Sequence, residues 1–167
     1  MGNMKSRKGV LFVCHGNICR SPAAEGVFQT LIQERQVSDS VFADSAGTSD
    51  EHAGELAHAV TRRIASKHGI NLTHKSRVFV PADFDLFHLI LLMDNWNFRN
   101  VSALARNDSD RSKLRMYRSF DPASAELNRI PEVPDPYYGG IEGFEQVHAI
   151  FERTSPFILE YLMDSRR

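Results

Sequence analysis

Residues 10–21 read Val-Leu-Phe-Val-Cys-His-Gly-Asn-Ile-Cys-Arg-Ser, and this order of residue types predicts a strand, a tight loop and a helix. The first four residues are a continuous apolar run, which is typical of a central strand in a parallel sheet. Gly16 permits a tight turn and Asn17 tolerates a left-handed conformation. Ser21 is a favoured N-cap residue and Pro22 suits the first helical position, so we expect the helix to begin there.

The rest of the chain continues the alternation of strand-like and helix-like segments. We expect strands over 41–46, 86–93 and 113–117, and helices from Ser21, over about 56–67, over 95–104 and over 143–162. Strands that alternate with helices favour a mostly parallel sheet covered on both faces. The prediction is therefore an α/β fold of three layers, α/β/α, with a central four-stranded parallel sheet and a phosphate-binding loop between the first strand and the first helix.

Length and charge limit the classes of protein that fit. The chain has 167 residues, with 20 Lys plus Arg against 21 Asp plus Glu and a net charge of −1. That balance argues against a nucleic-acid partner, which favours a basic protein. We expect one domain over residues 8–167, a monomer, preceded by a flexible N-terminus over residues 1–7. No apolar run reaches the ~18 residues of a membrane span, and no signal peptide is visible, so a cytoplasmic protein is expected.

The N-terminal residues carry a possible lipidation signal. Gly2 is followed by a serine, Ser6, at the spacing of N-myristoylation sites. Lys5, Arg7 and Lys8 would add the basic charge that a single acyl chain needs for stable anchoring. Peripheral membrane association through Gly2 is therefore one interpretation. A solvated N-terminus, or initiation at Met4, is the alternative.

The loop after the first strand is a candidate phosphate cradle. Backbone N–H groups between a strand and a helix N-terminus converge on an anion, and the helix dipole adds positive potential. Arg20 can bind two phosphate oxygens through its planar guanidinium. The same field favours the thiolate of Cys14, which we expect to be the nucleophile, with Ser21 donating a hydrogen bond to it. The other loop residues are His15, Gly16, Asn17, Ile18 and Cys19.

A candidate general acid lies in the long proline-rich loop over residues 119–140. Asp135 stands between Pro134 and Pro136, which restrict the backbone around its side chain. A thiolate that accepts a phosphoryl group needs an acid to protonate the leaving oxygen. Tyr137 and Tyr138 would form an aromatic wall beside a ring-bearing substrate. Taken without the Cys14 loop, Asp135 would be a plain turn aspartate and the tyrosines exposed loop residues.

The chain resembles the low-molecular-weight protein tyrosine phosphatases from about Lys8 to Leu162. The nucleophile loop comes first and the acid comes near the end, which distinguishes this family from the larger tyrosine phosphatases. The matching segments are Cys14–Ser21, Asp44-Ser45-Ala46-Gly47-Thr48-Ser49, His68-Gly69-Ile70, Met93-Asp94 and Asp135-Pro136-Tyr137-Tyr138.

The resemblance implies hydrolysis of phosphotyrosine, in proteins and in small aryl phosphates, through a cysteinyl-phosphate intermediate on Cys14. Asp135 would protonate the leaving phenol and then activate water. Ser45 and His74 match positions that support the loop. The resemblance implies no cofactor and no metal, and the other histidines have no ligand-like spacing.

Cys19 matches a second loop cysteine of the family. In that setting it is a redox partner that forms a disulfide with Cys14 under peroxide. The alternative is a small packing residue.

Two departures from the sequence pattern of the family concern the cleft. Glu51 stands where many relatives have an aromatic residue, which would leave one wall missing or acidic. His58-Ala59-Val60 replaces a frequent Asp-Pro-Arg and removes an aspartate brace.

Other activities on this scaffold remain as alternatives. Thioredoxin-coupled arsenate reductases need further cysteines, and this chain has only two. Arginine phosphatases of the family carry threonine where this chain has Ile18, whose branched side chain should favour an aryl ester over phosphoarginine. A catalytically weak phosphotyrosine-binding module is the other alternative, but Cys14, Arg20 and Asp135 are all retained.

Overall fold

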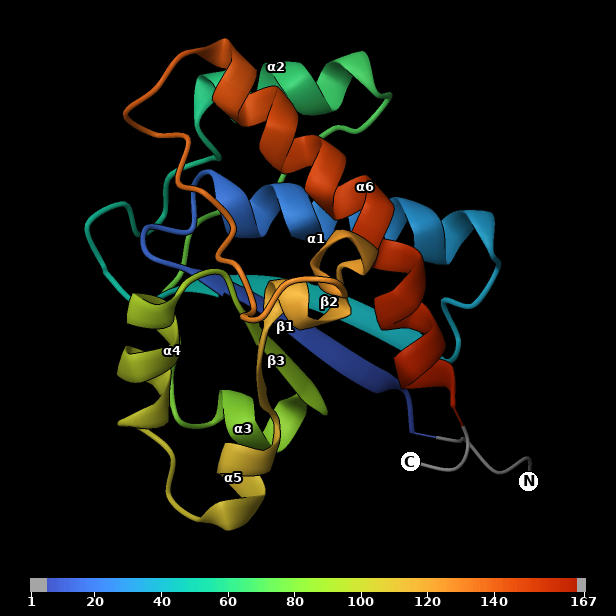
Figure 1. Ribbon diagram of the computed structural model, residues 1–167, viewed down its shortest axis with the longest axis vertical. Coiled ribbons are helices and arrows are strands. Elements are labelled where there is room, and N and C mark those ends of the chain that lie inside the picture. Colours follow the sequence, from blue (N-terminus) through green and yellow to red (C-terminus); the bar gives the residue numbers. More distant parts are fainter. Residues whose placement is uncertain (1–5, 165–167) are drawn as a thin grey trace.

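The fold is a four-stranded parallel sheet with helices on both faces (Figure 1). The computed structural model describes residues 6–164. The strands lie in the order β2-β1-β3-β4. Their bounds are β1 Lys8–Cys14, β2 Val41–Gly47, β3 Leu89–Leu92 and β4 Leu114–Met116. The predicted α/β fold with a central four-stranded parallel sheet is confirmed.

Helices α1, α2 and α6 lie on one side of the sheet, and α3, α4 and α5 lie on the other (Figure 1). The long helices of the first side are α1 Arg20–Glu34 and α6 Ile141–Met163, and α2 is Ala59–Lys67. The shorter helices are α3 Asp83–Leu86, α4 Asn95–Ser102 and α5 Asp108–Ser112. Two 3₁₀ helices, Tyr117–Phe120 and Pro122–Ser124, follow β4.

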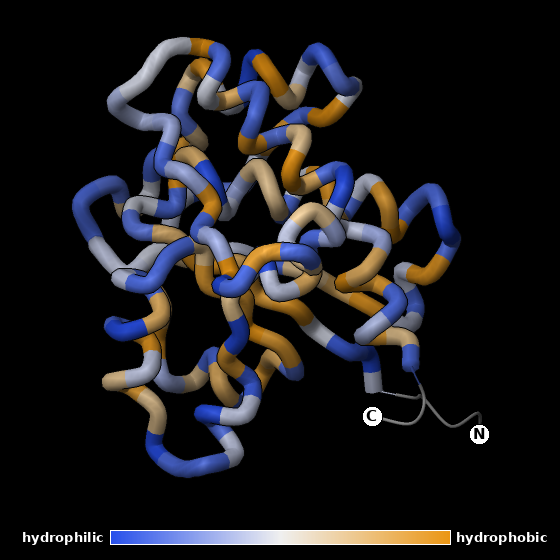
Figure 2. The backbone as a smooth tube through the Cα atoms, viewed as in Figure 1, coloured by the Kyte–Doolittle hydropathy of each residue, from blue (hydrophilic) through white to orange (hydrophobic). Residues whose placement is uncertain are grey.

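The apolar run of β1 is buried because its side chains fill cores on both faces of the sheet. Val10 and Phe12 pack with α1 and α6, whereas Leu11 and Val13 pack with residues of the α3 and α4 side. All four are fully buried. Figure 2 shows the resulting hydrophobic centre, with hydrophilic segments towards the outside. Side chains of a parallel strand that is covered on both faces must be apolar at every position.

β1 lies between β2 and β3, so its last residues face a neighbour on each side. Val13 pairs with Ala46 of β2 and with Leu92 of β3. The carboxyl ends of these strands therefore meet at one edge of the sheet, which is where open α/β sheets bind ligands.

Several predicted boundaries were wrong. The strand expected over 86–93 begins at Leu89, because α3 occupies the preceding turn and leaves Leu86 61% exposed. The helix expected from residue 56 begins at Ala59, because His58 caps it by accepting a hydrogen bond from Val60 N. Helix α5 was not expected at all.

Between residues 6 and 164, the structure contains no helix that is both long enough and apolar enough to cross a membrane. Gly2, the predicted lipidation site, lies outside the described residues.

Candidate active site

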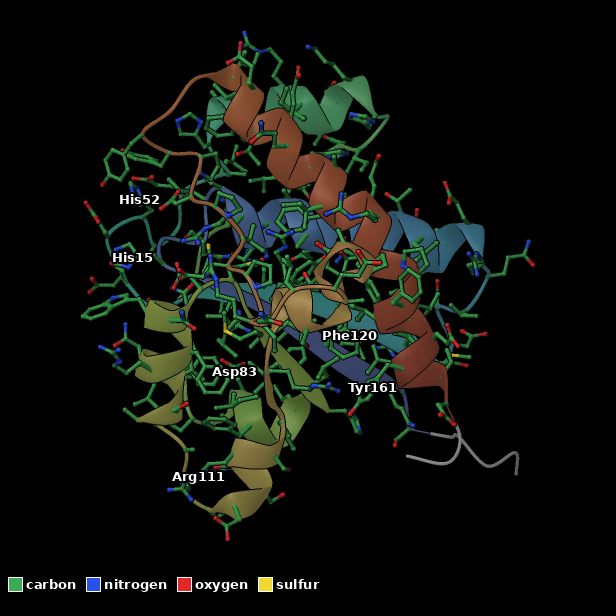
Figure 3. The ribbon with its side chains drawn as sticks, viewed as in Figure 1. His15, His52, Asp83, Arg111, Phe120 and Tyr161 are labelled. Carbon is green, nitrogen blue, oxygen red and sulfur yellow. The ribbon has the colours of Figure 1, made fainter. Side chains whose placement is uncertain are left out.

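The loop between β1 and α1 forms the floor of a cleft of about 550 Å³. His15 and His52 lie on the same side of the molecule at this loop (Figure 3). The cleft brings together residues that are more than a hundred positions apart in the sequence. Its lining consists of Cys14, His15, Gly16, Ile18, Cys19, Arg20, Glu51, His52, Asp135, Tyr137 and Tyr138.

The loop turns at Asn17, which has a φ of 55°. This left-handed conformation is one that asparagine tolerates, as the sequence indicated. The expectation that Ser21 caps the helix was wrong, because α1 begins at Arg20 with Cys19 at the N-cap position. Ser21 is instead inside the first turn, where its hydroxyl is directed at Cys14.

Cys14 is buried at the end of β1, and its sulfur lies 3.0 Å from Ser21 Oγ. Asn17 Nδ2 donates a hydrogen bond to the same Ser21 oxygen over 2.7 Å. The single proton of the Ser21 hydroxyl can be donated to the Cys14 sulfur at 3.0 Å or to Ala46 O at 3.4 Å, and the contact with the sulfur is the shorter one. The arrangement can stabilise a thiolate, both as a nucleophile and as a leaving group.

A buried polar network holds Asn17 from behind the loop. Asn17 Nδ2 also donates to Ser45 Oγ (3.0 Å), and Ser45 in turn donates to Glu25 Oε1 (2.8 Å). His74 Nε2 lies 2.8 Å from Asn17 Oδ1, and its Nδ1 lies 3.2 Å from Glu25 Oε1. Ser45 and His74 therefore occupy the supporting places that the resemblance implied for them.

The network contains a carboxyl group with a strongly altered pKa. Burial raises the pKa of Glu25 to about 7, although the charge of His74 and the Ser45 hydrogen bond oppose this effect. Burial by itself lowers the pKa of His74, but the hydrogen bond that His74 donates to Asp44 and the charge of Glu25 raise it overall. A proton is thus readily held between Glu25 and His74 near neutral pH.

The turn of the loop is also held from the segment after His74. Ser76 Oγ donates to Gly16 O over 2.9 Å, and Arg77 N donates to Asn17 Oδ1 over 3.0 Å. Gly47 at the end of β2 allows close approach, since a Cβ there would lie 2.7 Å from His15 O. These contacts fix the backbone of the loop at Gly16 and Asn17.

Arg20 is held in place by an acidic residue that follows β3. Its Nη1 donates to Asp94 Oδ2 over 2.8 Å and to Val133 O over 3.1 Å. Burial by itself lowers the pKa of Arg20, but the charges of the Cys14 thiolate and of Asp94 raise it overall. The guanidinium therefore stays charged although only 3% of the side chain is exposed.

Asp135 lines the same cleft and lies close to the guanidinium of Arg20. Its Oδ2 lies 3.6 Å from Arg20 Nη2, and its Oδ1 accepts a hydrogen bond from Tyr137 N over 3.1 Å. The backbone bond orients the carboxyl group, while 42% of the side chain is open to solvent. The Asp135 carboxyl group thus lies beside the guanidinium, in the cleft that Cys14 also lines.

The walls of the cleft combine aromatic rings with imidazoles. Tyr137 and Tyr138 are exposed, with ring centroids 4.9 Å apart. Glu51 lines the cleft, and His52 beside it places its ring 6.5 Å from that of Tyr137. The expectation of a missing or acidic wall was therefore incomplete, because His52 supplies a ring there.

His58 supplies a brace of its own in the segment where relatives carry an aspartate. Its N–H donates to Ile18 O over 2.8 Å. Its ring stacks on Phe144 at 5.2 Å and meets Tyr137 edge-on at 5.8 Å. The loop is therefore supported here by a backbone hydrogen bond and ring packing.

Cys19 is buried at the end of the nucleophile loop and packs with Ile18. Burial raises the pKa of Cys19 to about 12. Cys14 and Cys19 are both free thiols, and both line the cleft.

Comparison with known proteins assigns the chain to a family. The family model described as low molecular weight phosphotyrosine protein phosphatase matches residues 9–166. The chain belongs to the low-molecular-weight phosphotyrosine protein phosphatase family. A low molecular weight protein-tyrosine-phosphatase of Streptomyces coelicolor is 41% identical over 150 residues, covering 90% of each chain.

Solved structures of other phosphatases share the fold of this phosphatase. A protein tyrosine phosphatase from Entamoeba histolytica superposes with a TM-score of 0.87 at 34% identity, covering 96% of this chain and 99% of the other. A Drosophila arginine phosphatase superposes with a TM-score of 0.82 at 27% identity, covering 93% and 98%.

The sequence predicted no role for three residues of the site in this phosphatase, although Met93-Asp94 was among the segments that match the family. Asp94 stands two residues after the end of a buried strand, so its position at the carboxyl edge of the sheet was a usable signal. Glu25 sits on the buried face of α1, and His52 sits in a surface turn. Nothing in the local pattern of Glu25 or His52 distinguished them from ordinary polar residues.

Proposed function

We propose that this phosphatase removes phosphate from tyrosine side chains of proteins, with Cys14 as the nucleophile, Arg20 as the phosphate ligand and Asp135 as the general acid. The observation that carries the assignment is the position of the Cys14 sulfur. It lies under the N-terminus of α1, with a hydroxyl donor at 3.0 Å and with Arg20 and Asp135 in the same cleft.

In the first step the Cys14 thiolate attacks phosphorus as the bond from phosphorus to the phenolic oxygen breaks. Arg20 and the loop N–H groups stabilise the charge on the three equatorial oxygens. Asp135 gives its proton to the departing phenolic oxygen. The products are a free tyrosine and a phosphate ester on the Cys14 sulfur.

In the second step water replaces the sulfur on phosphorus. Asp135, now ionised, accepts a proton from the attacking water. The bond from sulfur to phosphorus breaks, and the electron pair returns to Cys14. Ser21 donates its hydrogen bond to the leaving sulfur, so the thiolate is a better leaving group. Inorganic phosphate then leaves the cleft.

Ile18 favours an aryl ester over phosphoarginine. Its side chain lines the cleft and packs with Cys19, Ile64 and Phe144, which leaves an apolar surface beside the phosphate site. The rings of Tyr137 and His52 on the walls suit a flat aromatic group. Phosphoarginine is the second candidate substrate, because the Drosophila arginine phosphatase shares this fold.

The decisive experiment is hydrolysis of p-nitrophenyl phosphate and of a phosphotyrosine peptide, run beside phosphoarginine and phosphoserine. We expect activity on the first two that vanadate inhibits competitively and that persists in the presence of a chelator. Cys14→Ser should abolish turnover. Full activity in that variant would contradict the mechanism. A preference for phosphoarginine would show that the substrate is phosphoarginine and not phosphotyrosine.

A monomeric state, a cytoplasmic location and acylation of Gly2 also remain proposals. The basic residues near Gly2 support the lipid proposal. The intact mass of the protein expressed in a eukaryotic cell tests it, since an unmodified mass excludes the anchor there. The molar mass in solution, measured by light scattering, tests the monomeric state, since a monomer has 18.9 kDa.

A further inference from the structure

Two histidines and a glutamate meet at the junction of α2 and α6, outside the cleft. His68 is the C-cap residue of α2, and His148 and Glu152 lie one turn apart on α6. In the sequence His148 had no ligand-like spacing, because His68 is eighty positions away. The fold brings α2 and α6 together (Figure 1) and places one ligand atom of each residue within 4.8 Å of the others.

We propose that His68, His148 and Glu152 form a binding site for a divalent transition-metal ion, with zinc as the reference metal. His68 Nδ1 lies 3.2 Å from Glu152 Oε1, and His148 Nε2 lies 3.1 Å from the same oxygen. Ligand atoms around a tetrahedral zinc are about 3.4 Å apart, given bonds of about 2.1 Å. Two of the three separations are therefore already close to what such an ion requires, and the third, between the two nitrogens, is within 4.8 Å.

The donor set selects the class of metal. Two imidazole nitrogens and one carboxylate oxygen suit zinc, cobalt, nickel or copper, and do not suit calcium or magnesium, which prefer oxygen alone. Three protein ligands leave a fourth position for water, on the side where His68 and Glu152 are about half exposed. The ion therefore has a route from solvent.

The site combines one fixed ligand with two adjustable ones. His148 is 4% exposed, whereas the side chains of His68 and Glu152 are 45% and 48% exposed. The two imidazole rings stack at 4.1 Å with 21° between their planes, and one nitrogen of each ring lies against the same Glu152 oxygen. The exposed His68 ring can tilt about its own side-chain bonds to direct its lone pair at an ion held by His148.

A metal at this place would fasten together two helices whose N-terminal ends pack beside Tyr137, a wall residue of the cleft. At the other end of α2, His58 packs on Phe144 in the first turn of α6 and on Tyr137. Zinc at the His68 end would thus add a second tie between α2 and α6. We expect bound zinc to raise the thermal unfolding temperature of the protein, because it binds the folded state alone.

Titration of the metal-free full-length protein with Co²⁺ tests the proposal by a readout independent of phosphatase activity. We expect one equivalent to bind, with the visible absorption bands of tetrahedral cobalt and without thiolate-to-cobalt charge-transfer bands. Zinc should displace the cobalt. Charge-transfer bands would instead place the ion at Cys14 or Cys19 and overturn the proposal, as would an absence of binding with metal in excess.

Variants separate this site from any other. His68→Ala and Glu152→Gln remove exposed ligands, so neither opens a gap in the core, and each should weaken binding at least about tenfold. His148→Ala should do the same. Glu145→Gln is the matched control, since Glu145 is an exposed carboxylate on α6 paired with Lys67 at 3.8 Å. Unchanged binding in His68→Ala, or equal loss in Glu145→Gln, would overturn the assignment.

Discussion

Arg20 donates a hydrogen bond to Asp94 across 2.8 Å, so the residue that would hold the phosphate is itself held by the residue that follows β3. Asp94 also caps α4, because its other oxygen accepts from Asn97 N over 2.7 Å. One carboxylate therefore orients the guanidinium and begins a helix. These two roles can be separated by the choice of substitution.

Asp94→Asn should lower activity without unfolding the protein. Asparagine is as good an N-cap as aspartate, so α4 keeps its cap, but the charge that fixes Arg20 is lost. We expect kcat/KM for p-nitrophenyl phosphate to fall by about tenfold, because a hydrogen bond to a charged group contributes about 1.5 kcal/mol or more. The thermal unfolding temperature of Asp94→Asn should stay close to that of the native protein. Asp94→Ala is the comparison, and it should lose about 1 kcal/mol of stability as well.

Asp135→Asn should distinguish substrates by the basicity of their leaving groups. The amide can still accept the hydrogen bond from Tyr137 N but cannot supply a proton. We expect kcat for phosphotyrosine to fall by about 10²–10⁴, the usual contribution of general acid catalysis. The loss for p-nitrophenyl phosphate should be smaller, since nitrophenolate leaves without protonation. Equal losses on both substrates would contradict the role of acid.

Glu25→Gln should remove part of the dependence of stability on pH. The pKa of Glu25 is raised from its ordinary value of 4.5 to about 7, so the folded protein holds a proton that the unfolded chain releases. Between these two values the free energy of unfolding falls as pH rises, by at most about 1.4 kcal/mol per pH unit from this group. The slope halves near pH 7 and vanishes well above it, where Glu25 is ionised in both states.

Urea unfolding at pH 5, 6 and 7 measures this effect. The native protein should lose stability along the series, and Glu25→Gln should lose less. Glu142→Gln on α6 is a suitable control, because that carboxyl group is exposed and lies outside the network. A parallel pH dependence in the native protein and in Glu25→Gln would show that Glu25 does not hold the proton.

Cys19→Ser should make oxidative inactivation harder to reverse. If Cys19 captures oxidised Cys14 as a disulfide, dithiothreitol restores the native enzyme after peroxide treatment, whereas the variant proceeds to irreversible acids. Burial raises the pKa of Cys19 to about 12, so little thiolate is present and the capture should be slow. The fraction of activity recovered, at matched doses of peroxide, is the measurement. Equal recovery in both proteins would leave Cys19 as a packing residue.

The strand, the loop and the first helix were predictable because their signals are local. Residues 10–13 are apolar without interruption, and Gly16 and Asn17 punctuate the turn, so sequence neighbours alone specify the unit. The start of β3 was not predictable from the sequence, because Leu86 is as apolar as Leu89. Only pairing with β1 and β4 decides where the strand begins. Residues that meet across the fold, such as Glu25 and His74, leave no mark on the local pattern.

The predictable parts of the site are likewise those whose signals are local in the sequence. Cys14 and Arg20 share one short segment with a recognisable spacing, and Asp135 stands between two prolines. The ring of His52 belongs to the cleft only because its surface turn folds back over Gly16. Position in a turn is decided by tertiary contacts, which residue type alone does not specify.

The left-handed turn at Asn17 has a consequence for anyone who wishes to move this loop into another protein. Glycine would accept the backbone angle, yet it would sever the bonds that Asn17 makes to Ser21, Ser45 and His74. The segment Cys14–Ser21, transplanted alone, would keep its sequence but lose the contacts that fix its conformation. The portable unit is the loop together with the end of β2 and the segment around His74, three pieces of chain that must be grafted as one.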